Sequence, residues 1–510
     1  MLSTSMDEKS FSKHREIQEA WYNGLNLQNN LFCSLKSLLL DNCDFEQYAI
    51  PSNILPCLKN LNQLTVRNCN KIKVIFDMND NDTIETTSQL KLLFLEGLPE
   101  LTSVWKKNCQ GILRFQNLLM VSVRSCQHIQ TLFPAALARK LTMLQRLHVD
   151  SCQEFQQIVG KEDTGTDVMK KLVFPSLTTL YLLNLPEFKY FYTELFIVEC
   201  PKLNDLHVFG CPEVEGECSS TSINRPPFFS DLKAPNLREM DIGWCSSLDM
   251  SLPQFSKISE ILEHLEILTM NKLSELKFIG SEDSSWLNNV WEKLCELNVH
   301  SCPDLTTLLH STSTISFSNL KELYISECPK LNYLFTSSAT KNLMHLEKII
   351  VVNCSSMEKV MAKDKDEAPQ VIELKKLRWV LLKSLSSLEC FYSGYDILQL
   401  PSLKKVEISD CLNMQKFAQG SVRAKYFGGS QVSSCSNYDL VLNNQDYIAK
   451  VDQKILLQRV NTLSLSNDHD SNFCLNLMFS CNHDQLYLLI MRNERNHKRE
   501  NSTLNIIQYN

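Results

Sequence analysis

A small group of residues near the end of the chain has side chains that could bind a metal ion. Two thiols and two imidazoles occur there: His469, Cys474, Cys481 and His483. Six residues separate the two cysteines, whereas the paired cysteines of structural zinc sites are usually separated by roughly two to four. We therefore expect no metal site.

Catalytic motifs are absent from the sequence. It has no G-x-x-x-x-G-K-[ST] phosphate loop, no G-x-G-x-x-G, no H-E-x-x-H and no C-x-x-C. His148 and His207 have no Ser or Cys nucleophile at a fixed distance along the chain, so contact with a partner suits them better than catalysis. We expect a protein that is not an enzyme and that binds no cofactor.

One repeated unit organises most of the chain. In Leu320–Leu334, LKELYISECPKLNYL, apolar residues occupy positions one, four and six, Cys328 occupies position nine, and leucines follow three and six residues later. Alternation at positions four and six predicts a short strand with one buried face, while position five points the other way. One such unit cannot bury its own apolar face, so it needs a neighbour on each side.

The unit recurs about fourteen times, and each copy begins with a leucine: Leu35, Leu61, Leu90, Leu118, Leu144, Leu177, Leu203, Leu237, Leu265, Leu294, Leu320, Leu346, Leu377 and Leu403. Successive ninth positions are never closer than 26 residues. The additional residues of longer repeats are polar or charged, as in 161–171, 215–234 and 362–370, which predicts solvated loops.

Cysteine occupies the ninth position in ten repeats: Cys43, Cys69, Cys126, Cys152, Cys211, Cys245, Cys302, Cys328, Cys354 and Cys411. Leucine takes the same place at Leu98, Leu185, Leu273 and Leu385. Because cysteine alternates with leucine there, we expect a structural spine of packed, reduced thiols rather than disulfides.

These patterns predict an α/β repeat solenoid: a horseshoe with a parallel β-sheet on its concave side and an irregular or short-helical convex side. PAALARKL after Phe133 and SSATKNLMHL after Thr336 are the clearest candidate helices. The expected organisation is a lead-in or cap at 1–30, the array at 31–420, a degenerate repeat or cap at 421–470 and a polar tail at 471–510.

Charge and hydropathy favour a protein partner. The net charge of −7, from 51 basic and 58 acidic residues, does not suggest nucleic acid or an anionic membrane. The first residues lack the pattern of a secretory leader, and no stretch of about 18 apolar residues occurs. We expect a cytoplasmic protein, with the nucleus possible.

Candidate partner-binding residues lie on the predicted concave face, where large rings are unusual because the face should be solvated. They are Phe94, His148, Tyr181, His207, Phe209, Trp244, Tyr324 and Trp379. The alternative is that these rings cover one another. Basic residues also gather at Arg378, Lys383, Lys404 and Lys405, after acidic Glu296, Glu322, Glu327 and Glu347; a solvated face explains them most simply, and a charge-sorted partner is the alternative.

The repeat L-x-x-L-x-[VIL]-x-x-C-x-x-[LI]-x-x-[LV] resembles the C-terminal leucine-rich repeats of plant coiled-coil nucleotide-binding disease-resistance proteins. LNQLTVRNCNKIKVI and LQRLHVDSCQEFQQI show it well, as do the two CPKL phrases at 200–203 and 328–331. The resemblance implies a module of innate immunity that binds a pathogen effector, a guarded host protein or a nucleotide-binding domain supplied elsewhere.

The resemblance does not extend to the family's nucleotide switch, because the sequence contains no phosphate-binding loop. The alternative function is the substrate-recognition arm of an F-box ubiquitin ligase adaptor, whose repeats also end their strands in C-x-x-[LI]. Residues 1–30 leave little room for an F-box, which argues against this alternative.

Overall fold

A computed structural model describes most of the repeat region. The described residues are 8–12, 34–77, 88–106, 115–160, 171–192, 197–212, 232–243, 262–274, 276–279, 288–309, 317–364, 371–424 and 431–433. The chain divides into two compact units, Met1–Tyr447 and Ile448–Asn510, and the described residues all belong to the first. They include no helix long and apolar enough to cross a membrane.

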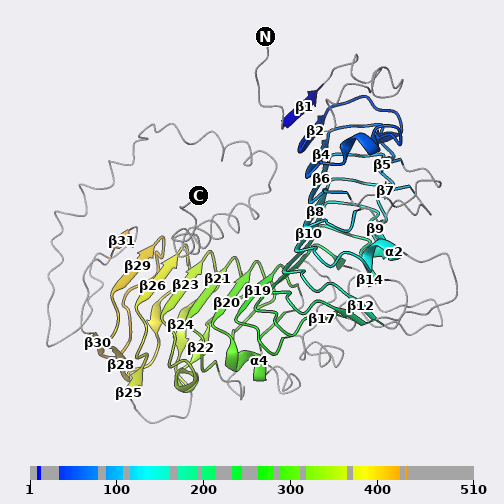
Figure 1. Cartoon of the computed structure of the whole chain (residues 1–510). Helices are drawn as coiled ribbons and strands as arrows, with labels where there is room; N and C mark the ends of the chain where they lie inside the picture. Colours follow the sequence, from blue (N-terminus) through cyan, green and yellow to red (C-terminus); the bar gives the residue numbers. More distant parts are fainter. Residues whose placement is uncertain are drawn as a thin grey trace, which may run out of the picture. The chain divides into compact units, whose positions relative to one another are not determined.

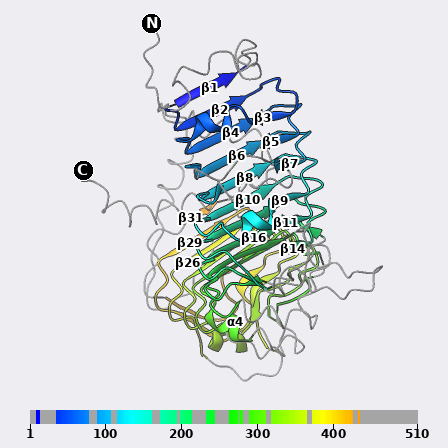
Figure 2. The same cartoon turned by 45° about the vertical axis from the view of Figure 1, so that its right-hand side comes forward.

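The main sheet of the described part has sixteen parallel strands in chain order (Figures 1 and 2). They are β1 (Glu8–Ser12), β2 (Ser37–Asp41), β4 (Gln63–Arg67), β6 (Leu92–Glu96), β8 (Met120–Arg124), β10 (Arg146–Asp150), β13 (Thr179–Leu183), β16 (Asp205–Phe209), β18 (Glu239–Gly243), β19 (Ile267–Asn271), β20 (Glu296–His300), β21 (Glu322–Ser326), β23 (Lys348–Val352), β26 (Trp379–Lys383), β29 (Lys405–Ser409) and β31 (Gln431–Ser433). From β2 to β29, each strand spans positions three to seven of one repeat.

The predicted register is confirmed. Equivalent positions pair directly across the sheet, as with Leu297 beside Leu323 and Leu323 beside Ile349. Side chains at positions four and six are buried in one continuous core, and Cys328 at position nine has no exposed surface. The period-two alternation fixes this register, because a slip of one residue would turn the apolar side chains out of the core.

The nine described spine cysteines are buried thiols that form no disulfide, as expected for packing residues; Cys245 lies outside the described residues. Each Sγ lies 3.2–3.6 Å from the carbonyl oxygen two residues earlier, within reach of a weak S–H hydrogen bond. A thiol therefore fills the space that leucine fills elsewhere and also bonds the backbone as it leaves the strand.

A left-handed residue at position eight turns the chain out of the sheet in thirteen repeats. These residues are Asn42, Asn68, Gly97, Ser125, Ser151, Asn184, Gly210, Lys272, Ser301, Glu327, Asn353, Ser384 and Asp410. Gly, Asn, Asp and Ser dominate because they tolerate a positive φ or make local hydrogen bonds. In twelve of the thirteen, all but Asp410, the backbone N–H bonds a carbonyl of the next repeat, as from Asn42 to the Arg67 carbonyl at 2.9 Å, so the turn continues the ladder.

Short parallel strands, rather than helices, form most of the side across the core (Figure 1). They make five three-stranded sheets: β3 (Tyr48–Ile50), β5 (Val74–Phe76) and β7 (Ser103–Trp105); β9 (Thr131–Pro134), β11 (Gln157–Gly160) and β14 (Tyr190–Tyr192); β12 (Lys171–Val173), β15 (Ile197–Glu199) and β17 (Leu232–Lys233); β22 (Phe335–Thr336), β24 (Lys359–Ala362) and β27 (Cys390–Tyr392); β25 (Val371–Glu373), β28 (Ile397–Leu400) and β30 (Val422–Ala424).

The parallel solenoid is thus confirmed, but the short-helical side needs correction. Within the described residues, PAALARKL contains the four-residue α2 (Ala135–Ala138) and SSATKNLMHL contains the 3₁₀ turn η6 (Ser338–Asn342). Only α4 (Asn288–Lys293) and the 3₁₀ turn η1 (Leu55–Leu58) add to these in that part. Elsewhere, β-branched and aromatic residues stack on equivalents one repeat away, which favours strand over helix; Phe391 and Phe417 stack at 4.7 Å.

Candidate functional site

The outer face of the main sheet consists of the side chains at positions three, five and seven, which point away from the core. It is the face that the sequence predicts to be concave. Position five runs along its middle, and in-register pairing brings each of these side chains beside its equivalent on the next strand: Ser122, His148, Tyr181, His207 and Asp241 follow one another from β8 to β18. Residues far apart in sequence thus form one continuous row.

Three of the predicted contact residues stack together in this row. The rings of Tyr181 and His207 lie 4.3 Å apart and nearly parallel, at 9°. His148 meets the other side of Tyr181 edge-on, with ring centroids 5.4 Å apart. On the far side of His207, Asp241 Oδ2 lies 3.5 Å from its Nδ1. His207 is only 2% exposed, whereas His148 and Tyr181 are half-buried.

The surroundings of His148 disfavour its charged form. Burial, reinforced by the nearby Arg124 guanidinium and His207, lowers the pKa of His148 to about 4, although Asp150 acts in the opposite direction. Nδ1 lies 3.5 Å from the Ser122 hydroxyl. A neutral imidazole at neutral pH can both donate and accept a hydrogen bond, which suits recognition of a polar partner group.

A second group of predicted residues lies further along the face. Trp379 on β26 is half-buried between two lysines, with Lys348 Nζ 4.5 Å and Lys405 Nζ 4.8 Å from its ring centroid. Lys348 also lies 4.5 Å from the ring of Tyr324 and contacts the Tyr324 hydroxyl, which donates to Glu322 Oε2 at 2.6 Å. Tyr324 is only 6% exposed, so it supports Lys348 more than it offers surface to a partner.

The remaining predicted residues do not join these groups as directly. Phe94 is half-buried on β6, between Thr65 and Ser122 in the position-five row. Phe209 is half-buried at position seven of β16. Trp244 lies outside the described residues. The structure therefore places the seven described candidates on one face, five of them in two clusters.

No described group of three or more His, Cys, Asp or Glu side chains could hold a metal ion. The four residues from His469 to His483 lie outside the described part, so the structure does not test them. What the described outer face offers is stacking, cation–π and ion-pair contacts.

Two segments of the chain match a known family of repeats. Residues 5–153 and 310–355 match the sequence profile of the family described as "Plant disease resistance protein RPS2-like, leucine-rich repeats". Over these two segments the chain is similar to the leucine-rich repeats of plant disease-resistance proteins. No curated protein matches the chain. The structure titled "Crystal structure of TLR13-ssRNA13 complex" is 14% identical, with 81% of this chain and 80% of that chain covered, and its TM-score of 0.22 is too low to support an argument.

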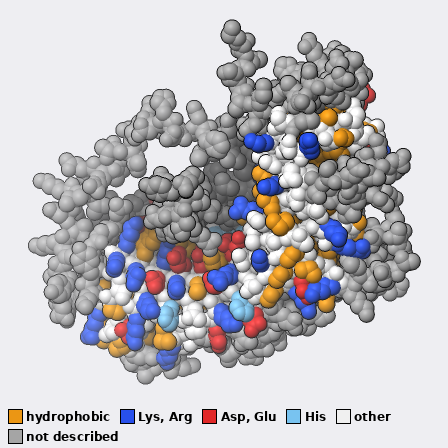
Figure 3. All heavy atoms as spheres, viewed as in Figure 1, with side chains coloured by type: hydrophobic (Ala, Val, Ile, Leu, Met, Phe, Trp, Pro, Cys, Tyr) orange, Lys and Arg blue, Asp and Glu red, His pale blue; other side chains and the backbone are white. Residues whose placement is uncertain are grey.

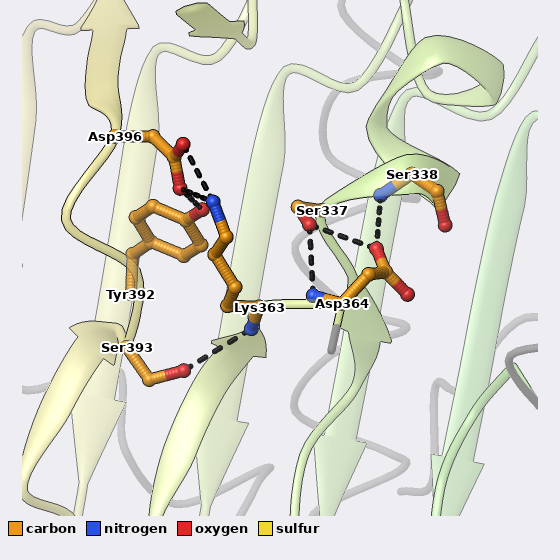
Figure 4. Close-up of polar contacts among 7 residues, drawn as sticks. All are labelled: Ser337, Ser338, Lys363, Asp364, Tyr392, Ser393 and Asp396. Carbon is orange, nitrogen blue, oxygen red and sulfur yellow. Dashed lines mark hydrogen bonds and ion pairs between the residues drawn. The ribbon is translucent and has the colours of Figure 1, made fainter. Parts of the chain in front are cut away.

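The repeats also contain a polar network that sequence reasoning missed, on the side opposite the main sheet (Figure 4). Asp396, 2% exposed, accepts two bonds of 2.7 Å from Lys363 Nζ and one from the Tyr392 hydroxyl. Burial and this carboxylate raise the pKa of Tyr392. Gly394 leaves room here, since a Cβ on it would collide with the Tyr392 ring.

Asp364 forms the other half of the network. Its Oδ2 accepts from the Ser337 hydroxyl at 2.8 Å and from the Ser338 N–H at 2.7 Å. Although burial opposes the charged form, these hydrogen bonds hold the pKa of Asp364 below its usual value. Lys363 and Asp364, adjacent in sequence, thereby tie three successive repeats together. In the sequence, these two residues belong to a polar, charged segment that looks like a solvated loop. Nothing in that segment indicates that their partners lie about thirty residues away along the chain.

Proposed function

We propose that this chain is a non-catalytic recognition module of plant innate immunity, which binds a pathogen effector or a guarded host protein on the outer face of its main sheet. The family match supports the setting, because leucine-rich repeats of resistance proteins generally mediate protein interactions. The site and the class of partner are our inference.

One observation carries the proposal: from strand to strand, the residue type stays apolar at position four but changes at position five. Position four, inside, is apolar in successive strands, as at Val121, Leu147, Leu180, Leu206 and Met240. Position five, outside, changes from hydroxyl to imidazole, phenol and carboxylate over the same strands. The fold constrains the inner column, so the outer column is available to encode a partner.

The proposal is tested with two outer-face rings that lie apart from the lysine-rich end. Phe94→Ala/Tyr181→Ala removes half-buried aromatic contacts that interfaces use as anchors. Tyr395→Ala is the matched control, since this 82% exposed aromatic lies in the segment between β27 and β28, across the core. Proximity labelling in plant tissue identifies candidate partners, and binding of each purified candidate is then compared among the wild type and both variants.

We expect the double variant to fold, to lose at least about tenfold in affinity and to weaken the defence response, while the control stays unchanged. Equal binding by all three proteins would refute a role for this face. Recovery of a ubiquitin ligase subunit as the direct partner would favour the F-box adaptor alternative.

A cytoplasmic location is part of the proposal. The spine of free thiols supports it, because a reducing compartment preserves buried thiols that lie close together. Imaging of the tagged full chain tests this location, and accumulation in the secretory pathway would contradict it.

A further inference from the structure

The lysine-rich end of the outer face has a composition of its own. We define the basic–aromatic patch as Lys348, Trp379, Leu381, Lys383, Lys404 and Lys405, on or next to β23, β26 and β29. In Figure 3, the part of the surface where Figure 1 shows these strands carries Lys and Arg side chains next to a group of Asp and Glu side chains. The patch combines an apolar centre with a cationic surround.

The centre of the patch is a preorganised aromatic surface. Lys348, Trp379 and Lys405 occupy position three of consecutive strands and pair in register. Both ammonium groups lie within 5 Å of the Trp379 centroid, close enough for cation–π attraction. Leu381, two residues along the same strand and on the same face, is also half-buried. Held rings lose little conformational entropy when a partner packs against them.

The charge of the patch is only partly balanced within the described chain. Lys348 pairs with Glu322 at 3.4 Å, and Lys405 pairs with Glu407. Lys383 and Lys404 are exposed and form no ion pair with any described residue. Two cations therefore flank the apolar centre with their charges available to a ligand.

We propose, building on the proposed function, that the basic–aromatic patch is the docking site for an acidic segment of the protein partner. An apolar or aromatic side chain of that segment packs against Trp379 and Leu381, and its flanking carboxylates pair with Lys383 and Lys404. Charge complementarity selects this occupant: it supplies the anions that the two lysines lack and the apolar group that the centre can bury.

Single-stranded nucleic acid is the other ligand class that combines anions with stacking rings. The patch suits single-stranded nucleic acid less well. Glu322 lies in the position-three row with Trp379, and Glu407 lies in the position-five row with Leu381, so both carboxylates would repel a continuous phosphate backbone. A protein segment can place its carboxylates at the lysines alone.

Fluorescence anisotropy with the full chain tests the inference. The probe is a short labelled peptide with Asp and Glu on both sides of a central Phe; its Asn/Gln counterpart and an oligo-dT of similar length are compared. Lys383→Glu/Lys404→Glu reverses two exposed charges that support no described ion pair. Lys71→Glu/Lys73→Glu is the control, because it makes the same charge change at two exposed residues in a different repeat, just beyond β4.

We expect the acidic peptide to bind more tightly than its amide counterpart, with affinity that falls as salt rises. Lys383→Glu/Lys404→Glu and Trp379→Ala should each weaken binding at least about tenfold, and the control should bind like the wild type.

Failure of the acidic peptide to bind the folded wild type, equal weakening by the control, or tighter binding of oligo-dT would overturn the inference. The proposed function has a separate test, since Phe94 and Tyr181 lie outside the patch. If Phe94→Ala/Tyr181→Ala loses partner binding but the wild type does not bind the acidic peptide, the docking site at the patch is refuted and the proposed function is not.

Discussion

Lowering the pH should destabilise the repeats around β10 through His148. Its folded-state pKa is lowered from 6.5 to about 4, so the unfolded chain takes up a proton at a higher pH than the folded chain does. The stabilising contribution is fully present above pH 6.5 and is lost as pH falls from 6.5 towards 4. Between pH 8 and pH 5, linkage gives a loss of about 2 kcal/mol from this one group.

Two measurements test this expectation. Carbon-13 labelling of the 11 histidines, with His148 assigned by its absence in His148→Gln, gives the pKa directly by NMR titration. Denaturant unfolding at pH 8 and pH 5 then compares wild type with His148→Gln, and the variant should lose about 2 kcal/mol less stability over that interval. Titration of His148 near pH 6.5, or the same loss in both proteins, would refute the reasoning.

Further changes should separate the framework from the surface. Lys363→Met should lower the free energy of unfolding by about 2–4 kcal/mol, because it removes two charge-assisted bonds from the buried Asp396, and adding Asp396→Asn should restore part of that loss. Leu323→Ala should cost about 2–5 kcal/mol in the same denaturation assay, whereas Trp379→Ala should cost far less. Gly97→Ala, at φ +61° and 3.0 Å from a neighbouring oxygen, should lower the melting temperature, and Gly160→Ala is the tolerated control. In the native protein, thiol reagents should reach the half-buried Cys57 and Cys295 before the spine cysteines; equal rates would contradict the buried spine.

The sequence predicted the main sheet well because every repeat states the same pattern. Leu323 and Ile325 alternate with polar neighbours, and the next repeat 26 residues on confirms the same register, so errors at one repeat are corrected by the others. The strand lies where the pattern places it, around Leu323 and Ile325, although it begins at Glu322 rather than at Leu320. The turn at position eight also carried a readable signal, because its Asn, Gly and Ser residues tolerate a positive φ or make local hydrogen bonds.

The return side and the fine structure of the candidate site were less predictable. Short apolar segments such as Tyr190–Tyr192 fit a strand or a turn of helix equally well, and only pairing with equivalent segments decides between them. For the candidate site, the position-five pattern correctly predicted which side of the sheet the side chains lie on. It did not predict how deeply each side chain is buried. Tyr324 and His207 are covered because of what lies on adjacent strands, which no single repeat reveals.

The left-handed residue at position eight has a consequence for how the chain tolerates changes in length. Because every described turn leaves the sheet at the same height, the strands form a grid with rungs about 4.8 Å apart. A residue added within positions three to seven would shift the reading frame and exchange core and surface along that strand. Residues added past position nine leave the frame untouched. A ligand bound along the outer face therefore meets strands at a constant spacing, although the loops behind the sheet vary in length.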